Sequence, residues 1–334
     1  GAFKGCSSLV SISVPFVGAS RTATYYSAVF GYIFGYTTTC SGTNGYYSGY
    51  KSVSSTFVDT KYSSVSGATW QYSVVSNSSS YYDEHDITSY YYYIPAMLTT
   101  VTITDATSIP LMAFNGCTNI TNVVLNDEVT TINSYAFRNC TKLESADIGT
   151  GLTTLNSYAF YNCSALESIT IPSGTTSIAT YAFYDNTSLA SVSLPNSMTT
   201  INSYVFYNTT SLKELVFPTE LKTIGDYAFY GTRIRSLNIP SKVTSIGSNA
   251  FNGDAALTSL TIPGNVKTIG SYAFSGCANI TLLTLNSGIQ SIGEYAFQNL
   301  KITTVTVPDS VTSIGAGAFK GCSSLVSISV PFVG

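Results

Sequence analysis

The stretch LTSLTIPGNVKTIGSYAFSGC, from Leu257 to Cys277, contains one complete unit of a pattern that runs through most of this 334-residue chain. Its phenylalanine belongs to a series in which each member follows the last by 22 or 23 residues. The series consists of Phe114, Phe137, Phe160, Phe183, Phe206, Phe229, Phe251, Phe274, Phe297 and Phe319. Such a period is typical of repeat proteins, in which each unit buries its apolar side against its neighbours. The chain is therefore predicted to be a repeat solenoid rather than a globule.

Aliphatic residues return in fixed columns around each phenylalanine. Ile269 stands five residues before Phe274, and Ile280 stands six residues after it. An alternating triplet such as Ile169-Thr170-Ile171 follows, and Pro172 closes it. Apolar residues two apart predict a short strand buried on one face, and a proline, which has no N–H, ends the strand. A 23-residue period has no room for a long helix, so the return segment is expected to consist of tight turns or a short 3₁₀ segment.

These columns resemble the BspA-like leucine-rich repeats of the Treponema pallidum type, whose pattern is Leu-x-x-Ile-x-Ile-Pro-x-x-Val-x-x-Ile-Gly-x-x-Ala-Phe-x-x-Cys. The quoted stretch has the residues of this pattern, with Leu260 in place of one isoleucine. The resemblance covers residues 1–35 and 97–334. It implies a right-handed leucine-rich repeat coil with short parallel strands, found in extracellular or cell-surface proteins that adhere to host matrix proteins, mucosa or other microbes. It implies no enzyme activity and no cofactor.

The first hundred residues contain two of these modules and one insertion. Phe3 and Phe34 stand on the phenylalanine column, but the strand of the second module resumes only at Val101 and Ile103. We therefore divide the chain into leucine-rich repeat modules at 1–35, a Tyr-rich insertion at 36–96, and further modules of 22–23 residues at 97–334. Insertions in solenoids form loops on one face, which is often the binding face.

The insertion differs from the modules in composition. More than half of the 26 tyrosines of the chain lie in or beside it, and alternating stretches such as TWQYSVVS predict a small β-hairpin or sheet. Tyrosine with serine and glycine is the composition of antibody paratopes, because the ring gives a large rigid contact area. An alternative is that the rings pack among themselves and on the solenoid. The candidate ligand contacts are Trp70, Tyr81, Tyr82, Tyr90, Tyr91, Tyr92 and Tyr93.

Charge and motif content exclude several classes of function. Only 9 % of the residues are charged and the net charge is -3, so no basic surface for nucleic acid is expected. No apolar run is long enough to span a membrane. The single histidine, His85, stands among Asp83, Glu84 and Asp86 without a recurring ligand spacing, and neither a nucleophile motif nor a phosphate loop is present. We therefore predict no catalysis, no metal site and no cofactor.

Two further columns accompany each phenylalanine. Cys117, Cys140 and Cys163 stand three residues after it, where small polar residues stand in other modules, so they are expected to be buried free thiols of a structural ladder. The expected distance between neighbouring coils would also allow a disulfide bond between two of these thiols. Tyrosines recur two residues before the phenylalanine and one residue after it. They either stack and stiffen the rod or form an exposed ridge for a partner. The outward strand residues are mostly Ser and Thr, which suits neutral partners such as glycans.

The phrase GAFKGCSSLVSISVPFVG occupies both residues 1–18 and residues 317–334. Because the two copies agree at surface positions as well as in the buried columns, we interpret the interval of 316 residues as one period of a longer tandem array or fibre. Two functions follow. The first is an adhesin that binds a host matrix protein, mucin or glycan. The alternative is a structural filament subunit that has no specific ligand, whose partners are copies of itself end to end or adjoining periods of the same chain.

Overall fold

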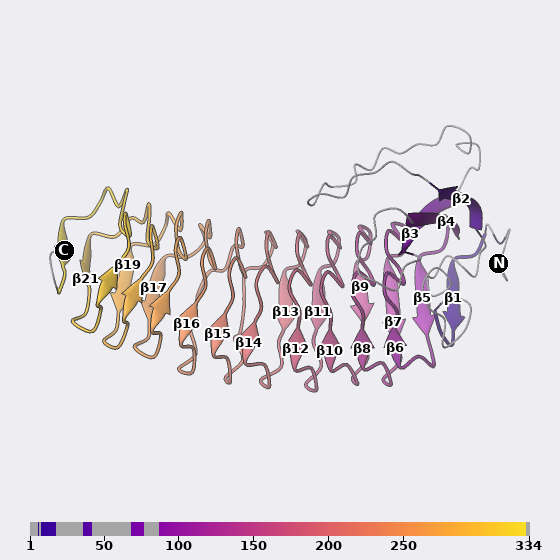
Figure 1. Ribbon diagram of the computed structural model, residues 1–334, viewed down its shortest axis with the longest axis horizontal. Coiled ribbons are helices and arrows are strands. Elements are labelled where there is room, and N and C mark those ends of the chain that lie inside the picture. The colour runs from indigo at the N-terminus through magenta and orange to yellow at the C-terminus, as the bar shows by residue number, and fades with distance from the viewer. Residues whose placement is uncertain (1–5, 7, 18–35, 42–67, 77–86, 332–334) are drawn as a thin grey trace.

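The computed structural model describes residues 6, 8–17, 36–41, 68–76 and 87–331, and within them the chain winds into an elongated rod of stacked coils (Figure 1). Most coils contribute two short strands joined by turns, whereas the segments after Leu212 and Ile234 lack the first of the two strands, and the described residues include no helix. The predicted solenoid is confirmed, and the return segments are turns rather than 3₁₀ segments in the described part of the chain.

The first series of parallel strands follows the buried leucine of each coil. In β11 and β13, Ser168, Ile169 and Thr170 pair with Ser191, Val192 and Ser193, so that each residue lies beside its equivalent one repeat away. The series divides into separate sheets, β1-β5-β7-β9, β11-β13, β17-β19 and β21-β23. The strands are β1 (Ser11–Val14), β5 (Thr100–Ile103), β7 (Asn122–Leu125), β9 (Ser145–Asp147), β11 (Ser168–Thr170), β13 (Ser191–Ser193), β17 (Ser259–Ile262), β19 (Leu282–Leu285), β21 (Thr304–Thr306) and β23 (Ser327–Ser329).

The second series consists of Thr-Ile or Ser-Ile pairs, with one Thr-Leu pair, before the phenylalanine turn. These two-residue strands form the sheets β12-β10-β8-β6 and β14-β15-β16-β18-β20-β22. The isoleucine or leucine of each pair points into the core, while the hydroxyl residue faces outward. The strands are β6 (Ser108–Ile109), β8 (Thr131–Ile132), β10 (Thr154–Leu155), β12 (Ser177–Ile178), β14 (Thr200–Ile201), β15 (Thr223–Ile224), β16 (Ser245–Ile246), β18 (Thr268–Ile269), β20 (Ser291–Ile292) and β22 (Ser313–Ile314).

One continuous core runs between the two series. The nine phenylalanines from Phe114 to Phe297 are fully buried, and Phe319 is partly buried. Neighbouring rings of the column stack nearly parallel, with centroids 4.9 to 5.9 Å apart. Stacking of identical rings one coil apart gives the rod its core, because no single coil encloses its own phenylalanine.

The insertion contains an antiparallel sheet of three strands in the order β2-β4-β3. These strands are β2 (Tyr36–Ser41), β3 (Ala68–Ser76) and β4 (Ile87–Pro95). On either side of the insertion, β1 pairs directly with β5, with Ile12 beside Val101 and Val14 beside Ile103. The solenoid therefore continues in register across the insertion. The proposed anchors Phe3 and Phe34 lie outside the described residues.

Candidate functional site: the inserted sheet and the tyrosine ladders

The inserted sheet brings several candidate contact residues together along its backbone. Trp70 of β3 pairs with Tyr93 of β4, and Tyr36 of β2 pairs with Tyr92 of β4. Tyr90 and Tyr91 continue the same central strand. Tyr81 and Tyr82 lie outside the described residues, as do Asp83, Glu84, His85 and Asp86.

The inserted sheet is attached to the rod at the end of β4. Ile94 and Leu98 are fully buried in the solenoid core. The side-chain amide of Asn119 donates a hydrogen bond to the Ala96 carbonyl at 2.9 Å, and the Leu98 N–H donates to the Pro95 carbonyl at 3.0 Å. The last residues of β4 are thus held by the solenoid, and the sheet lies beside the rod near β5 and β7 (Figure 1).

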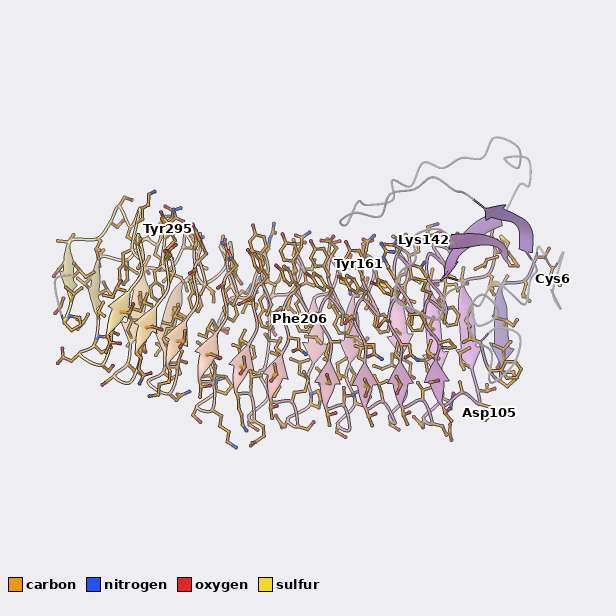
Figure 2. The ribbon with its side chains drawn as sticks, in the orientation of Figure 1. Cys6, Asp105, Lys142, Tyr161, Phe206 and Tyr295 are labelled. Atoms are coloured by element: carbon orange, nitrogen blue, oxygen red, sulfur yellow. The ribbon has the colours of Figure 1, made fainter. Side chains whose placement is uncertain are left out.

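A second aromatic surface lies on the rod itself and consists of two columns of stacked tyrosines, which we call the double tyrosine ladder. Ring centroids of neighbouring residues are 4.6 to 4.8 Å apart in the first column and 4.5 to 5.0 Å apart in the second. The first column is Tyr135, Tyr158, Tyr181, Tyr204 and Tyr227, and the second is Tyr161, Tyr184, Tyr207 and Tyr230. All nine residues are half-buried, and Figure 2 places Tyr161 at the edge of the rod with Phe206 inside it.

The ring faces at the ends of the ladder also have neighbours. The Arg138 guanidinium lies 5.7 Å from the centre of the Tyr135 ring and 5.6 Å from that of Tyr161, which is cation–π distance. At the other end the two columns continue with Asn249 and Asn252, whose side-chain amides hydrogen-bond at 2.8 Å. Arg138 was missing from the predicted site residues. The signal was its place in the second column, one coil before Tyr161.

With its ring faces stacked, the ladder presents ring edges and hydroxyl groups to solvent. Burial raises the pKa of Tyr161, and burial with the nearby Asp185 carboxylate raises the pKa of Tyr184. Burial likewise raises the pKa of Asp185, which accepts a hydrogen bond from the Asn208 amide at 2.8 Å. The hydroxyls of these tyrosines therefore stay protonated at neutral pH. The ladder therefore offers hydrogen-bond donors and acceptors at its hydroxyl groups.

The backbone of the first tyrosine column is unusual. Each residue is in the left-handed region, with φ between 55° and 62° from Tyr135 to Tyr227. This conformation is uncommon for a bulky residue and costs roughly 1–2 kcal/mol. The position requires it, because Asn249 and Gly317 at equivalent sites have φ of 56° and 64°. Stacking of the rings offsets part of this cost.

Cys117, Cys140 and Cys163 form a column of buried free thiols behind the phenylalanines. The Cys140 Sγ donates to the Phe114 carbonyl at 3.1 Å, and the Cys163 Sγ donates to the Phe137 carbonyl at 3.0 Å. Burial raises the pKa of all three thiols, to about 12 for Cys140. Cys140 and Cys163 thus satisfy backbone carbonyls of the preceding coil, and all three buried thiols are poor nucleophiles.

The remaining described surface of the rod carries mainly small polar side chains. Among the described residues, no group of three or more His, Cys, Asp or Glu residues could hold a metal ion. In the same part of the chain, no helix is long and apolar enough to cross a membrane. Most outward residues of the first strand series are exposed hydroxyls, for example Ser168, Thr170, Ser191 and Ser193, although Val124 and Leu282 are exposed there as well.

This repeat architecture has a match among known protein families. The family model described as BspA type leucine rich repeat region matches residues 85–209, 176–258 and 244–332, in six copies. A comparison with curated proteins gave no match. Among solved structures, a leucine-rich repeat protein from Bacteroides ovatus is 25 % identical, with 80 % of this chain and 88 % of that chain covered and a TM-score of 0.43.

Two other solved structures are similar over comparable lengths. A leucine rich cell surface protein from Faecalibacterium prausnitzii is 24 % identical, covering 78 % of this chain and 86 % of that chain, with a TM-score of 0.47. The T. pallidum leucine rich repeat protein is 23 % identical, covering 68 % and 77 % of the two chains, with a TM-score of 0.30.

Proposed function

The chain belongs to the BspA-type leucine-rich repeat family, and from that premise we propose that it is a non-catalytic, extracellular or cell-surface scaffold that acts as an adhesin. The rod supplies rigidity and length, and the Tyr-rich inserted sheet supplies contacts to a host matrix protein, mucin or glycan. Stacked repeats provide extended surfaces that suit this division of labour.

The observation that supports the proposal best is the way the insertion joins the rod. Because β1 and β5 pair in register on either side of it, the solenoid gains nothing in continuity from the inserted sheet. The strands of that sheet nevertheless pair over many residues, with nine residue pairs between β3 and β4. A folded, Tyr-rich element that the rod does not need for its own ladder is most simply explained by binding.

The test is a variant in which residues 36–93 are replaced by a short Gly-Ser linker while Ile94, Pro95 and Leu98 are kept. Because these three residues pack on the solenoid, the rod of the variant is expected to keep its circular dichroism spectrum and its melting temperature. Attachment to immobilised matrix proteins and mucin is expected to fall to background. A deletion variant that folds and attaches as well as the full chain would reject the role of the insertion.

A second set of substitutions tests whether attachment depends on the aromatic side chains of the insertion or only on the presence of the inserted segment. The first variant removes aromatic groups of the insertion but keeps the chain length. It combines Trp70→Ala with Tyr90→Ser, Tyr91→Ser, Tyr92→Ser and Tyr93→Ser. The matched control is Tyr295→Ser on the rod, which removes a tyrosine outside both the insertion and the double tyrosine ladder. The proposal expects the first variant to lose attachment and the control to keep it.

The alternative function is a structural filament subunit, and the duplicated phrase favours it. Its two copies place the same residues in β1 and in β23, so both strands occupy the same position of the coil pattern. Electron microscopy of the native material tests this alternative. Continuous rods with a regular repeat would support it, and discrete capped monomers would contradict it.

A further inference from the structure

We propose that a groove between β9 and β11 on the hydroxyl-rich face of the rod is a binding site for a neutral saccharide unit. The groove has a volume of about 340 Å³, near the lower limit for small-molecule sites. This inference deepens the proposed adhesin by giving the rod a ligand site of its own, apart from the inserted sheet.

The groove exists because one residue departs from the repeat. Ala146 stands in the inward column of the first strand series, where the other coils hold Ile, Val or Leu. Its neighbours in this column, Val123 and Ile169, are 2 % and 4 % exposed, whereas Ala146 is only half-buried. The missing methyl groups therefore leave a hollow that solvent reaches from the strand face.

The strands beside the hollow also part from one another. β9 pairs with β7 and β11 pairs with β13, but β9 and β11 belong to different sheets although they follow one another along the rod (Figure 1). Between these two coils, near the start of the strands, the Glu167 N–H donates to the Glu144 carbonyl at a long 3.4 Å. At the groove, therefore, no sheet joins β9 to β11.

The loop after β9 departs from the repeat as well. Gly149 takes the place that Pro172 and Pro195 have on the next two coils. Its φ is 68°, and a Cβ added there would lie 2.6 Å from the Asn126 carbonyl oxygen, so a side chain is excluded. At Gly149 the wall of the groove therefore consists of backbone atoms alone.

The lining residues indicate the chemical class of the ligand. The floor is apolar, from Ala146 and Ile169, and the rim carries the hydroxyls of Ser145, Ser168 and Thr170 with the carboxylate of Asp147. No lining residue is basic, so the groove is unsuited to anions. A saccharide ring has an apolar face for such a floor and hydroxyl groups for such a rim. The Asp147 Oδ1 already accepts a bond from the Gly149 N–H at 3.2 Å, which fixes the orientation of its carboxylate.

The experiment uses the full chain with ¹³C-methyl-labelled alanine and follows the Ala146 methyl signal by NMR. Glucose, galactose, mannose and N-acetylglucosamine are titrated one at a time, and N-acetylneuraminic acid serves as the anionic comparison. We expect a saturable shift of the Ala146 signal with at least one neutral sugar and none with the anionic one. A wild-type protein without such a shift would overturn the proposal.

Two variants assign the binding to the groove, with sugar affinity measured by saturation transfer. Ala146→Val restores the residue type of the neighbouring Val123, so we expect an equal or higher melting temperature together with at least about tenfold weaker sugar binding. Asp147→Asn is expected to weaken binding, whereas Glu144→Gln, an exposed carboxylate of the same coil outside the groove, is expected to leave it unchanged. Undiminished binding by a folded Ala146→Val protein would contradict the assignment.

The same measurement on the insertion-deletion variant separates the two proposals. Sugar binding in the groove is expected to persist when residues 36–93 are replaced. Loss of matrix attachment with intact sugar binding would support both proposals. Intact attachment with intact sugar binding would reject the role of the insertion alone.

Discussion

The coils of Phe137 to Phe206 and those of Phe251 to Phe319 share one core but are held together differently at the phenylalanine turn. In the first group the second tyrosine column is filled by Arg138, Tyr161, Tyr184 and Tyr207. In the second group the same column holds Asn252, Ser275, Gln298 and Lys320. Neighbouring phenylalanines nevertheless stack at similar distances, 4.9 Å in one pair of the first group and 5.2 Å in one pair of the second.

The residue four places before the phenylalanine explains how the second group compensates. It is Asn or Ala in the first group and glycine in the second, at Gly247, Gly270, Gly293 and Gly315. A Cβ on Gly247 would lie 2.5 Å from the Gly225 carbonyl carbon, so the glycines let the backbones of successive coils approach closely. The first group uses two columns of stacked side chains on the outside of the turn, whereas the second uses close backbone contact with a single stacked pair, Tyr272 and Tyr295, at 4.9 Å. The same fold thus tolerates two means of joining neighbouring coils.

The largest expected difference between the two groups concerns pH and comes from Asp254 in the second group. In the first group burial also raises the pKa of Asp185, which adds a smaller dependence of the same sign. Asp254 stands in the cysteine column and is fully buried, and burial raises its pKa from 3.8 to about 6 despite hydrogen bonds from Thr232 and Ile234. Between these values the folded state binds a proton that the unfolded state has lost, so stability falls as pH rises through this window. The loss amounts to about 3 kcal/mol, and Asp254→Asn is expected to abolish it.

Denaturant unfolding of wild type and Asp254→Asn at pH 4, 5, 6 and 7 measures this effect. Hydrogen exchange by coil then localises it. The cysteine column of the first group holds Cys140, Cys163, Asn186 and Thr209. Burial raises the pKa of the two thiols, and the other two side chains do not titrate, so none of the four changes its charge between pH 4 and 7. A pH dependence of equal size in the amides of the first group would contradict the assignment to Asp254.

A smaller effect is expected from the glycine column. Gly270→Ala places a Cβ against the backbone of Gly247 and Ser248, which cannot yield as a flexible side chain would. We expect a loss of about 2 kcal/mol, within the range for overpacking. The matched change in the first group is Ala179→Gly, which removes a native Cβ from the same column and is expected to cost under about 1 kcal/mol, through backbone entropy. Equal losses at the two sites would show that the two groups do not differ in backbone contact.

The smallest expected effect tests the double tyrosine ladder. Tyr184 stacks on Tyr161 at 5.0 Å and on Tyr207 at 4.5 Å. Tyr184→Ser removes both stacked contacts and is expected to lower the free energy of unfolding by about 1–2 kcal/mol, because these half-buried pairs fall in the lower part of the range of about 0.5–1.5 kcal/mol for one aromatic pair. The control is Gln298→Ser in the second group, which stacks on no ring and is expected to cost about 0.5 kcal/mol. A Tyr184→Ser protein as stable as the control would mean that the stacking adds nothing.

Much of the fold could be predicted from particular residues. Phe160, Leu166 and Ile178 were assigned inward positions from spacing alone, and all three are buried. The left-handed backbone at Tyr158, the cation over Tyr135 and the gap beside Ala146 were not predicted. Each depends on the distance between residues on neighbouring coils. The sequence does show that Ala146 is a small residue in a column of larger aliphatic residues. It does not show whether the neighbouring side chains fill the space that the smaller residue leaves.

The sequence by itself determined the period, the inward columns and hence the coil, because burial follows from side-chain hydrophobicity repeated at fixed spacing. Tertiary structure alone decided which tyrosine surfaces remain open, how closely the coils approach and where the strand ladder parts. These features depend on differences of a few tenths of an ångström in the distance between residues one full repeat apart. Equivalent letters in a column therefore have different surroundings, as Ala146 and Ile169 show.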